Sequence, residues 1–341
     1  MLKKNISILI IGLDYQYSLE NFYKKAFYSI GIKKIFLFPN NIYYNLHCLL
    51  SSLKLSFLFA PINIIYQNKL NLFLKKKKPF DLIIIFKGIE INKKYLQELK
   101  NKNQETKIIN IFTDDPFNLD SPATSSISLL SSIPIYDYFF IWSLKIKDKL
   151  KKKYKDYKNF YYLPFGYDTF LHKYTKKKIN KKYISFIASG DSYRENFLKK
   201  IKRFKINIFG NSWSLVSTHH IIKRFVYGSQ LSKIISKSFI SINILREQNN
   251  GSHNMKTFEI PAMGGLLVTT RSYEQNVFFP ENKASVMFSS TKELQDKINF
   301  LFNNEKIAMK IRNKGFELSK KHSYINRAKY LLNIIWNTNV Q

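Results

Sequence analysis

The segment from Gly251 to Thr270, GSHNMKTFEIPAMGGLLVTT, holds the most specific combination of polar residues in the sequence. Asn254 is placed to cap a helix, and Lys256 and Glu259 lie three positions apart on one helical face. At a helix N-terminus, main-chain N–H groups, an amide and a lysine could hold a diphosphate, and a glutamate one turn later could accept two hydrogen bonds from a ribose diol. A surface Lys–Glu pair on an ordinary helix is the alternative, and the residues alone leave both interpretations open.

Two adjacent aspartates, Asp114 and Asp115, follow the apolar run KIINIF and precede Pro116. A carboxylate at the end of a strand could act as a general base on an acceptor hydroxyl, or hydrogen-bond to it. Asp and Pro are also common in plain turns, and adjacent acids resemble part of a metal site, although no partner ligands are evident. We take both aspartates as candidate catalytic residues and expect no metal.

The elements that must position these residues follow an alternating pattern. Short apolar runs alternate with longer amphipathic stretches, which is typical of parallel βα units. Strands are predicted at 5–11, 34–38, 81–86, 107–112, 138–142 and 160–163, and in a second series at 183–188, 206–209, 239–244 and 265–269. Helices are predicted at 18–30, 93–102, 195–203, 292–302, 305–320 and 324–336, with a helical region over 41–77 that breaks at Pro61.

The two series predict two domains. A chain of 341 residues with 45% hydrophobic residues is long enough to bury two cores. The lysine-rich stretch 173–182 separates the series and is the predicted linker. We therefore expect an N-terminal domain over 1–172, a C-terminal domain over 183–322, and a C-terminal helix over 323–341.

Five of the eleven glycines directly or closely follow an apolar run: Gly12, Gly88, Gly166, Gly190 and Gly210. Ligands of open parallel sheets bind beyond the carboxyl ends of the strands, where a glycine lets the main chain approach a phosphate. Each glycine alone is explained by a turn, but five of them in two lobes favour a ligand cleft between the lobes. No G-x-G-x-x-G or P-loop sequence is present, so redox dinucleotide binding and ATP hydrolysis lack their signatures.

The charge is strongly positive, with 56 Lys and Arg against 23 Asp and Glu and a formal net charge of +33. A polyanion partner would explain this excess: nucleic acid, an anionic membrane or a phosphorylated substrate. The alternative is an AT-rich genome, which enriches Lys, Asn, Ile, Tyr and Phe together. Because the charges are spread along the chain, we do not expect a nucleic-acid partner; a weak attraction to anionic lipid follows either way.

Compartment signals are few. The single cysteine, Cys48, excludes an intrachain disulfide and a multi-cysteine metal site. No apolar run reaches the length that spans a bilayer, and no secretory signal is visible. We expect a cytoplasmic protein, at most peripheral at the inner face of the membrane.

The 251–270 segment resembles the signature of the CgeB-type (spore maturation protein) glycosyltransferases, N-x-R-x-F-E-x-x-A-x-G-G before a strand. The matching residues are Asn254, Lys256, Phe258, Glu259, Ala262, Gly264 and Gly265. Weaker similarities to the same family are Phe186, Ser189, Gly190 and Arg194, then Gly210 with Trp213, and the tail His322-Ser323-Tyr324 with Arg327. The resemblance covers the whole C-terminal lobe.

This resemblance implies a GT-B fold: two Rossmann-like parallel α/β domains facing a central cleft, with the C-terminal helix over 323–341 crossing back to the N-terminal domain. A nucleotide-sugar donor would bind the C-terminal domain and the acceptor the N-terminal one. The resemblance implies no cofactor besides that co-substrate. Carried over residue by residue, Glu259 would hold the ribose, Asn254, Lys256 and Arg194 the diphosphate, and Gly190 would let phosphate approach the main chain. His253 adjoins this segment and could reach a phosphate or a sugar hydroxyl.

Two positions depart from the family pattern. Lys256 stands where the family usually has Arg, so a bidentate clamp becomes a point charge. Gly251 stands where retaining relatives carry Glu, which leaves the sugar and the stereochemistry open.

The leading hypothesis is sugar transfer from a nucleoside-diphosphate sugar to a hydroxyl of a glycan, a lipid-linked glycan or a protein. The same fold also hosts sugar-nucleotide epimerases and phosphorylases. A non-enzymatic, basic polyanion-binding protein is the third hypothesis.

Overall fold

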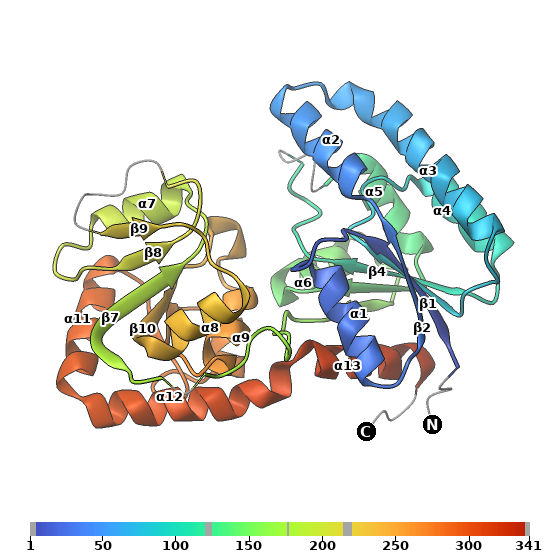
Figure 1. Cartoon of the computed structure of the whole chain (residues 1–341). Helices are drawn as coiled ribbons and strands as arrows, with labels where there is room; N and C mark the ends of the chain where they lie inside the picture. The colour runs from blue at the N-terminus through green and yellow to red at the C-terminus, as the bar shows by residue number, and fades with distance from the viewer. Residues whose placement is uncertain (1–4, 120–124, 176, 214–219, 338–341) are drawn as a thin grey trace. The chain divides into compact units, whose positions relative to one another are not determined.

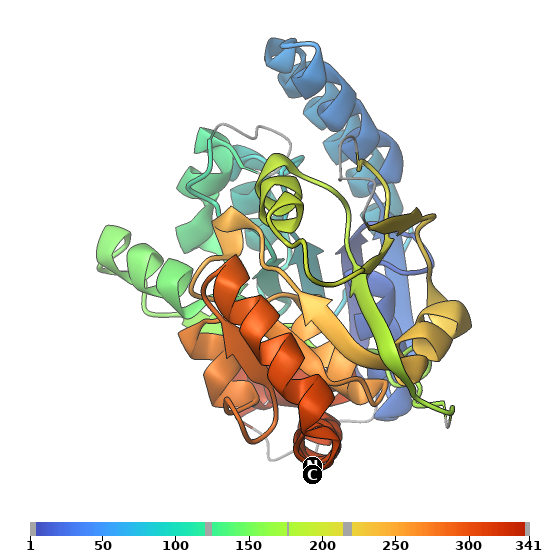
Figure 2. The same ribbon diagram turned by 90° about the vertical axis from the view of Figure 1, so that its left-hand side faces the viewer.

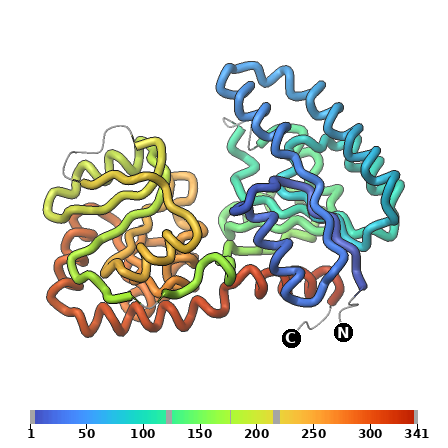
Figure 3. The backbone as a smooth tube through the Cα atoms, viewed as in Figure 1, coloured from blue at the N-terminus to red at the C-terminus, as the bar shows by residue number. Residues whose placement is uncertain are grey.

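The computed structural model describes residues 5–119, 125–175, 177–213 and 220–337. The chain divides into two compact units (Figure 1). Unit 1 comprises Met1–Pro164 and Arg327–Gln341, and unit 2 comprises Phe165–Asn326. The chain thus leaves unit 1, builds unit 2 and returns, as the trace in Figure 3 shows.

Unit 1 is built on one six-stranded sheet in the order β2-β1-β3-β4-β5-β6. All of its strand pairs are parallel. The strands are β1 (Ser7–Gly12), β2 (Lys34–Pro39), β3 (Leu82–Phe86), β4 (Lys107–Phe112), β5 (Tyr138–Ile141) and β6 (Phe160–Tyr162). β1 and β3 are runs of isoleucine and leucine buried along nearly their whole length, as expected for a parallel sheet covered on both faces.

The helices of unit 1 begin at polar caps where the sequence provides them. They are α1 (Leu19–Ser29), α2 (Asn41–Ser52), α3 (Phe59–Lys75), α4 (Lys93–Lys102), α5 (Ile127–Ser132) and α6 (Leu144–Lys153), with 3-10 turns η1 (Ser56–Leu58) and η2 (Ile133–Ile135). The side chains of Ser18 and Asn92 accept main-chain N–H groups at the starts of α1 and α4. The last helix, α13 (Tyr324–Trp336), is tied to this unit because Arg327 Nε donates to the carbonyl of Pro164 at 3.0 Å.

Unit 2 has a second six-stranded parallel sheet in the order β12-β11-β10-β7-β8-β9. Its strands are β7 (Asn180–Ile187), β8 (Asn207–Phe209), β9 (Ile221–Lys223), β10 (Ser238–Asn243), β11 (Leu267–Thr270) and β12 (Val286–Phe288). Numbered within the unit and taken from the β9 edge, this is the order 3-2-1-4-5-6 of dinucleotide-binding sheets, with the topological switch between β7 and β10.

Both faces of the second sheet are covered by helices (Figures 1 and 2). The helices are α7 (Ser192–Lys199), α8 (Gly228–Lys237), α9 (Met255–Ala262), α10 (Tyr273–Phe278), α11 (Thr291–Asn303) and α12 (Glu305–Ser319), with 3-10 turns η3 (Glu247–Asn249) and η4 (Lys320–His322). One core packs α7, α11 and the start of α12 against the sheet, and the other packs α8 and α9. The α9 N-terminus is thereby held at the carboxyl edge of the sheet.

The structure differs from the sequence-based elements in a few places. The break predicted at Pro61 is wrong: α2 ends at Ser52, and Pro61 lies in the first turn of α3, where its missing N–H removes no helical hydrogen bond. α7 begins at Ser192, earlier than predicted, because the Asp191 side chain accepts the N–H of Arg194. The last residues of the predicted linker, Asn180–Lys182, belong to β7.

The six-residue helices α5 and α10 and the three-residue strands β9 and β12 were not predicted, since such short elements leave little periodicity in a sequence. The ten-residue helix α8 was not predicted either. Among the described helices, none combines the length and the apolar character needed to cross a membrane.

Candidate functional site

The N-terminus of α9 lies at the carboxyl ends of β10 and β11, beside the topological switch of the second sheet. Asn254 caps the helix: its side-chain oxygen accepts the N–H of Thr257 at 3.1 Å, and the Thr257 hydroxyl accepts the N–H of Asn254 at 3.3 Å. This reciprocal capping box confirms the predicted cap. The first-turn N–H groups point toward the carboxyl edge of the sheet, the usual location for anion binding in this topology.

A buried polar network fixes that helix end. Asn254 Nδ2 donates to Asn243 Oδ1 at 2.9 Å, which joins α9 to the end of β10. Gln275 Oε1 accepts the hydroxyls of Thr257 and Thr269, each at 2.8 Å. The network therefore clamps α9, α10, β10 and β11 together, and the Asn254 amide is used to build the site rather than left free for a ligand.

Lys256 and Glu259 form an ion pair one turn into α9. Glu259 is only 3% exposed, whereas the Lys256 side chain is 20% exposed. Burial disfavours the charge on Glu259, but Lys256 and His172 outweigh it and leave the pKa of Glu259 below its ordinary value. Glu259 is thus ionised and acceptor-only, which suits a carboxylate that binds hydroxyl groups.

His172 is a partner that the sequence did not reveal. Its Nε2 lies 3.7 Å from Glu259 Oε1, and its Nδ1 accepts the N–H of Asp168 at 3.0 Å. That hydrogen bond puts the proton of a neutral ring on Nε2, facing the carboxylate. Burial lowers the pKa of His172. No spacing rule links positions 172 and 259, because the two residues lie far apart in the sequence.

His253 is fully buried, and both of its ring nitrogens are engaged. Nε2 accepts the N–H of Phe165 at 3.2 Å, so the proton lies on Nδ1, which donates to Glu274 Oε2 at 2.9 Å. Aromatic rings of Phe165, Phe258 and Phe278 surround it. Contact with a phosphate would cost one of these hydrogen bonds, so the geometry makes His253 a support that ties the start of unit 2 to α9.

Arg194 is also turned inward. Its Nε and Nη2 donate to the carbonyl of Ile244 at 3.0 and 2.8 Å, and Nη1 donates to the carbonyl of Ser189 at 3.1 Å. Burial lowers the pKa of Arg194 to about 10. The guanidinium therefore joins the loop after β7 to the end of β10 across the switch point. The neighbouring Arg246, 3.5 Å from Asp191 and more exposed, is a second cation at this edge.

Gly190 and Gly210 are explained by the packing of the protein itself. A Cβ on Gly190 would lie 2.1 Å from the carbonyl oxygen of Ser212, and one on Gly210 would lie 1.8 Å from that of Ala188. The loops after β7 and β8 pass too closely for any larger residue. These contacts require glycine without a ligand, so the glycine pattern alone does not mark a phosphate site.

Asp114 and Asp115 lie at the carboxyl end of β4 in unit 1. Asp114 pairs with Lys87 Nζ at 2.7 Å, and Asp115 accepts the N–H of Phe117 at 2.9 Å in a local turn. Burial opposes the charge on Lys87, but Asp114 and other neighbours raise the pKa of Lys87 above its ordinary value. Lys87 has a φ of 57°, a left-handed conformation that costs a non-glycine residue about 1 kcal/mol. Asp114 is thus held by a cation, while Asp115 has a turn-forming role.

Glu90 is a buried carboxyl of unit 1 that the sequence did not single out. It is 2% exposed, and its carboxylate accepts from Asn40 Nδ2 at 3.2 Å. Burial raises the pKa of Glu90 to about 7, and burial also raises the pKa of Glu20 on α1. These carboxyls and Lys87 interact near the carboxyl ends of β1 and β3, the switch point of this sheet. Glu90 follows β3 by four positions, the one signal available.

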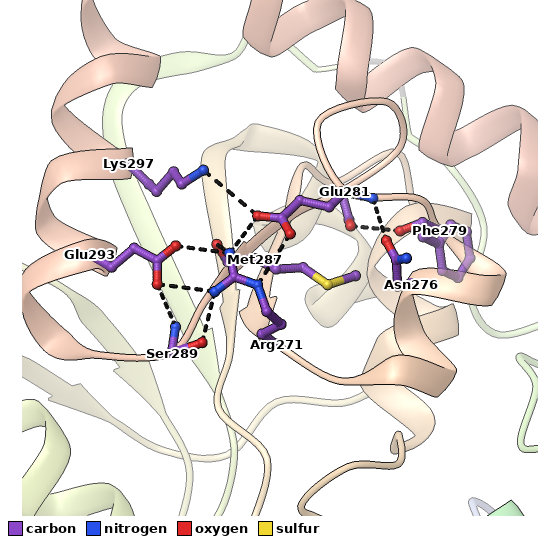
Figure 4. Close-up of polar contacts among 9 residues, drawn as sticks. Arg271, Asn276, Phe279, Glu281, Met287, Ser289, Glu293 and Lys297 are labelled. Carbon is purple, nitrogen blue, oxygen red and sulfur yellow. Dashed lines mark hydrogen bonds and ion pairs between the residues drawn. The ribbon is translucent and has the colours of Figure 1, made fainter.

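Another cluster stabilises the carboxyl ends of β11 and β12 (Figure 4). Arg271 donates to Glu281 and Glu293, with Nη2 at 2.7 and 2.8 Å from their Oε1 atoms, and to the hydroxyl of Ser289 at 2.7 Å. Lys297 lies 3.7 Å from Glu281. The pKa of Glu293 is lowered by its hydrogen bond to Arg271. All of these groups satisfy one another, so we read this cluster as structural.

Surface hollows lie elsewhere. One of about 490 Å³ lies between α11 and α12, and one of about 460 Å³ lies between α3 and α4. Both are grooves between helices; Glu293 and Lys297 of the Arg271 cluster line the first one. Neither groove is lined by Lys256, Glu259 or Asp114, so neither coincides with the candidate site. Within the described ranges, no three His, Cys, Asp or Glu side chains gather closely enough to hold a metal ion.

Residues 194–333, which include most of unit 2, match a family model described as glycosyl transferase-like. No curated protein matches the chain in sequence.

Solved structures share the fold. Anabaena Alr3699/HepE in complex with UDP-glucose has a TM-score of 0.64 at 9% identity, over 98% of this chain and 100% of that one. T4 phage BGT with its UDP-glucose substrate has a TM-score of 0.56 at 12% identity, over 96% and 98%. A mutant of S. aureus TarM, in complex with Fondaparinux, alpha-GlcNAc-glycerol and UDP, has a TM-score of 0.59 at 13% identity over 81% of this chain; this chain spans only 58% of that one.

These likenesses establish the architecture, with two parallel α/β units of six strands each. The chain has the GT-B fold, and its residues 194–333 match the glycosyl transferase-like family.

Proposed function

We propose that this protein is a glycosyltransferase that moves a sugar from a nucleoside-diphosphate sugar to a hydroxyl of a glycan, a lipid-linked glycan or a protein. The observation that carries the proposal is the N-terminus of α9. There a capped helix, an accessible lysine and a buried, ionised glutamate meet at the switch edge of a Rossmann-ordered sheet. The same residues lie inside the glycosyl transferase-like match.

Donor binding would use the two ends of the Lys256–Glu259 pair. Glu259 would accept hydrogen bonds from the ribose diol, while Lys256 would turn from Glu259 to the diphosphate. Because Glu259 is buried and ionised, its neutral or shortened replacement would lose most of this recognition. UDP-sugars are the first donors to test, since the structural neighbours HepE and BGT were solved with UDP-glucose.

The chemical step would rest on the leaving group. Negative charge builds on the diphosphate as the sugar bond breaks, and Lys256 with the N–H groups at the start of α9 would stabilise it. Asn254, Arg194, Gly190 and His253 would hold these groups in place through the contacts described above, rather than touch the donor.

The acceptor side would lie on unit 1. Asp114, set by Lys87, is the candidate to bind or deprotonate the acceptor hydroxyl, with Asp115 shaping the adjacent turn. The motif in α9 supports the CgeB-type group within the glycosyltransferases. A cytoplasmic location with peripheral contact to an anionic membrane belongs to the same proposal.

The test is a thermal-shift screen of the protein with UDP, GDP, CMP, TDP and their sugars. A ligand that binds the native state raises the melting temperature with its saturation. We expect one nucleotide to stabilise the protein selectively. Lys256→Ala and Glu259→Ala should abolish that shift, whereas Lys181→Ala, which removes an exposed ion pair of the same unit, should retain it.

Product analysis then follows with the selected donor. Transfer to an added acceptor supports the proposal, and a rearranged donor in the absence of acceptor indicates an epimerase. Failure of every nucleotide to shift the wild-type protein would contradict the donor site.

A further inference from the structure

Unit 1 carries a helical hairpin that extends beyond its sheet (Figures 1 and 2). The hairpin comprises α2, η1 and α3 with the lysines that follow, residues 41–78, and connects β2 to β3. Its base is anchored to β2 by aromatic contacts, because the ring centroids of Tyr66 and Phe73 lie 5.6 and 5.1 Å from that of Phe38. The rest of the hairpin has a face that no described residue covers.

That face is apolar. Nine of the 24 large hydrophobic side chains exposed in the described ranges belong to the hairpin, and none of the nine is a tyrosine. They are Ile42, Leu46, Leu49, Leu53, Phe57, Leu58, Ile64, Ile65 and Leu72. The first four are spaced by four, three and four positions, so they form one stripe along α2. Phe57, at the turn between the helices, is 72% exposed. Exposed apolar side chains aligned along one helix face are typical of an interaction surface.

The charged side chains of the same hairpin are all basic. It contains Lys54, Lys69 and Lys75–Lys78, and the sequence has no acidic residue between Glu20 and Asp81. Lys54, at the tip, has a left-handed φ of 59° and lies between the exposed Leu53 and the turn that carries Phe57. Elsewhere in unit 1, lysines such as Lys87 and Lys100 pair with acids. The hairpin lysines have no acids of their own segment to pair with.

We propose that the hairpin docks on the surface of an anionic lipid bilayer, with its apolar stripe in the interface and its lysines at the headgroups. A lipid surface suits both features, because apolar side chains enter the acyl boundary and nearby lysines are attracted to anionic headgroups. A second copy of this hairpin would oppose lysine to lysine, and nucleic acid would leave the leucines uncovered. The proposal deepens the peripheral membrane contact of the proposed function and does not rest on sugar transfer.

The test is co-sedimentation of the full chain with vesicles of phosphatidylcholine, with and without phosphatidylglycerol. Two triple variants probe the surface: Leu49→Gln/Leu53→Gln/Phe57→Gln, and Lys54→Gln/Lys69→Gln/Lys76→Gln. Matched controls are Ile127→Gln/Val277→Gln/Ile307→Gln and Lys93→Gln/Lys94→Gln/Lys151→Gln, which change as many exposed apolar or basic side chains elsewhere. Circular dichroism melting shows that each variant is folded.

We expect the wild type and both controls to bind the anionic vesicles, and each hairpin variant to bind at least about tenfold more weakly. Binding by the hairpin variants equal to that of their controls overturns the proposal. The proposal is also overturned if the wild type self-associates without lipid, or binds an oligonucleotide, and the hairpin variants lose that association or binding. The nucleotide-dependent thermal shift should persist in the hairpin variants. If the wild-type protein binds anionic vesicles but no nucleotide, the proposed sugar transfer is contradicted and the membrane proposal stands.

Discussion

The role assigned to a single residue depends on the partners that the structure gives it. Lys256 and Glu259 were selected by a three-residue spacing, and the structure adds the burial of the glutamate and the third member, His172. Arg194 and His253 were selected by resemblance and adjacency, yet their donors and acceptors are used within unit 2. A residue can therefore belong to a binding motif because it positions the loop and not because it touches the ligand.

Glu90 provides a prediction at this scale. Its folded pKa of about 7 exceeds the ordinary value of 4.5, because burial disfavours the charged form. Its contribution to stability is therefore fully present below the ordinary value and is lost as the pH rises through about 7, with an upper limit of about 3 kcal/mol from the size of the shift. Glu90→Gln should melt like the wild type near pH 5 and several degrees higher at pH 8.

The measurement is the melting temperature of both proteins against pH. Glu105→Gln, which changes an exposed glutamate of the same unit, serves as the control. Parallel curves for wild type and Glu90→Gln would show that this carboxyl does not titrate abnormally.

At the scale of elements, the site depends on how α9 begins. The cap on Asn254 and the network through Asn243 and Gln275 hold the helix end against two strands. The Arg271 cluster fixes the adjacent strand ends in the same way.

Asn254→Ala tests this dependence. Loss of the cap costs about 1 kcal/mol, and the side-chain oxygen of Asn243, which accepts a hydrogen bond from Asn254, loses that donor and adds to the cost. Asn254→Ser should recover most of the cap, since serine is also a good N-cap. Urea unfolding measures the free energies. Equal stabilities of the alanine and serine variants would mean that the capping hydrogen bond contributes little.

At the scale of the whole molecule, the net charge of +33 dominates. Like charges repel within a compact chain, and salt screens that repulsion over a Debye length of about 8 Å at physiological ionic strength. We therefore expect the melting temperature to rise with sodium chloride, most steeply at low concentration. Differential scanning calorimetry across a salt series measures this. A melting temperature that falls with salt would show that attractive pairs such as Lys87–Asp114 outweigh the repulsion.

The fold was largely predictable because its signal is local and repeated. Apolar runs such as 81–86 and 107–112 lie within a residue of the observed strands β3 and β4, and the long helices α11 and α12 lie where their periodicity placed them. Short elements such as β9 were not predicted, because a strand of three residues is too short to show a periodic pattern. The return of the chain to unit 1 at Arg327 had only the resemblance to indicate it.

The sequence by itself determined the α/β class, the capped helix at Asn254 and the pairing of Lys256 with Glu259, because all of these depend on spacings of a few residues. Only the tertiary structure decided the strand orders, the partnership of His172 with Glu259, the inward turn of Arg194 and the abnormal pKa of Glu90. Those features join residues tens of positions apart or arise from burial. Burial is a property of the packed chain, so no local pattern encodes it.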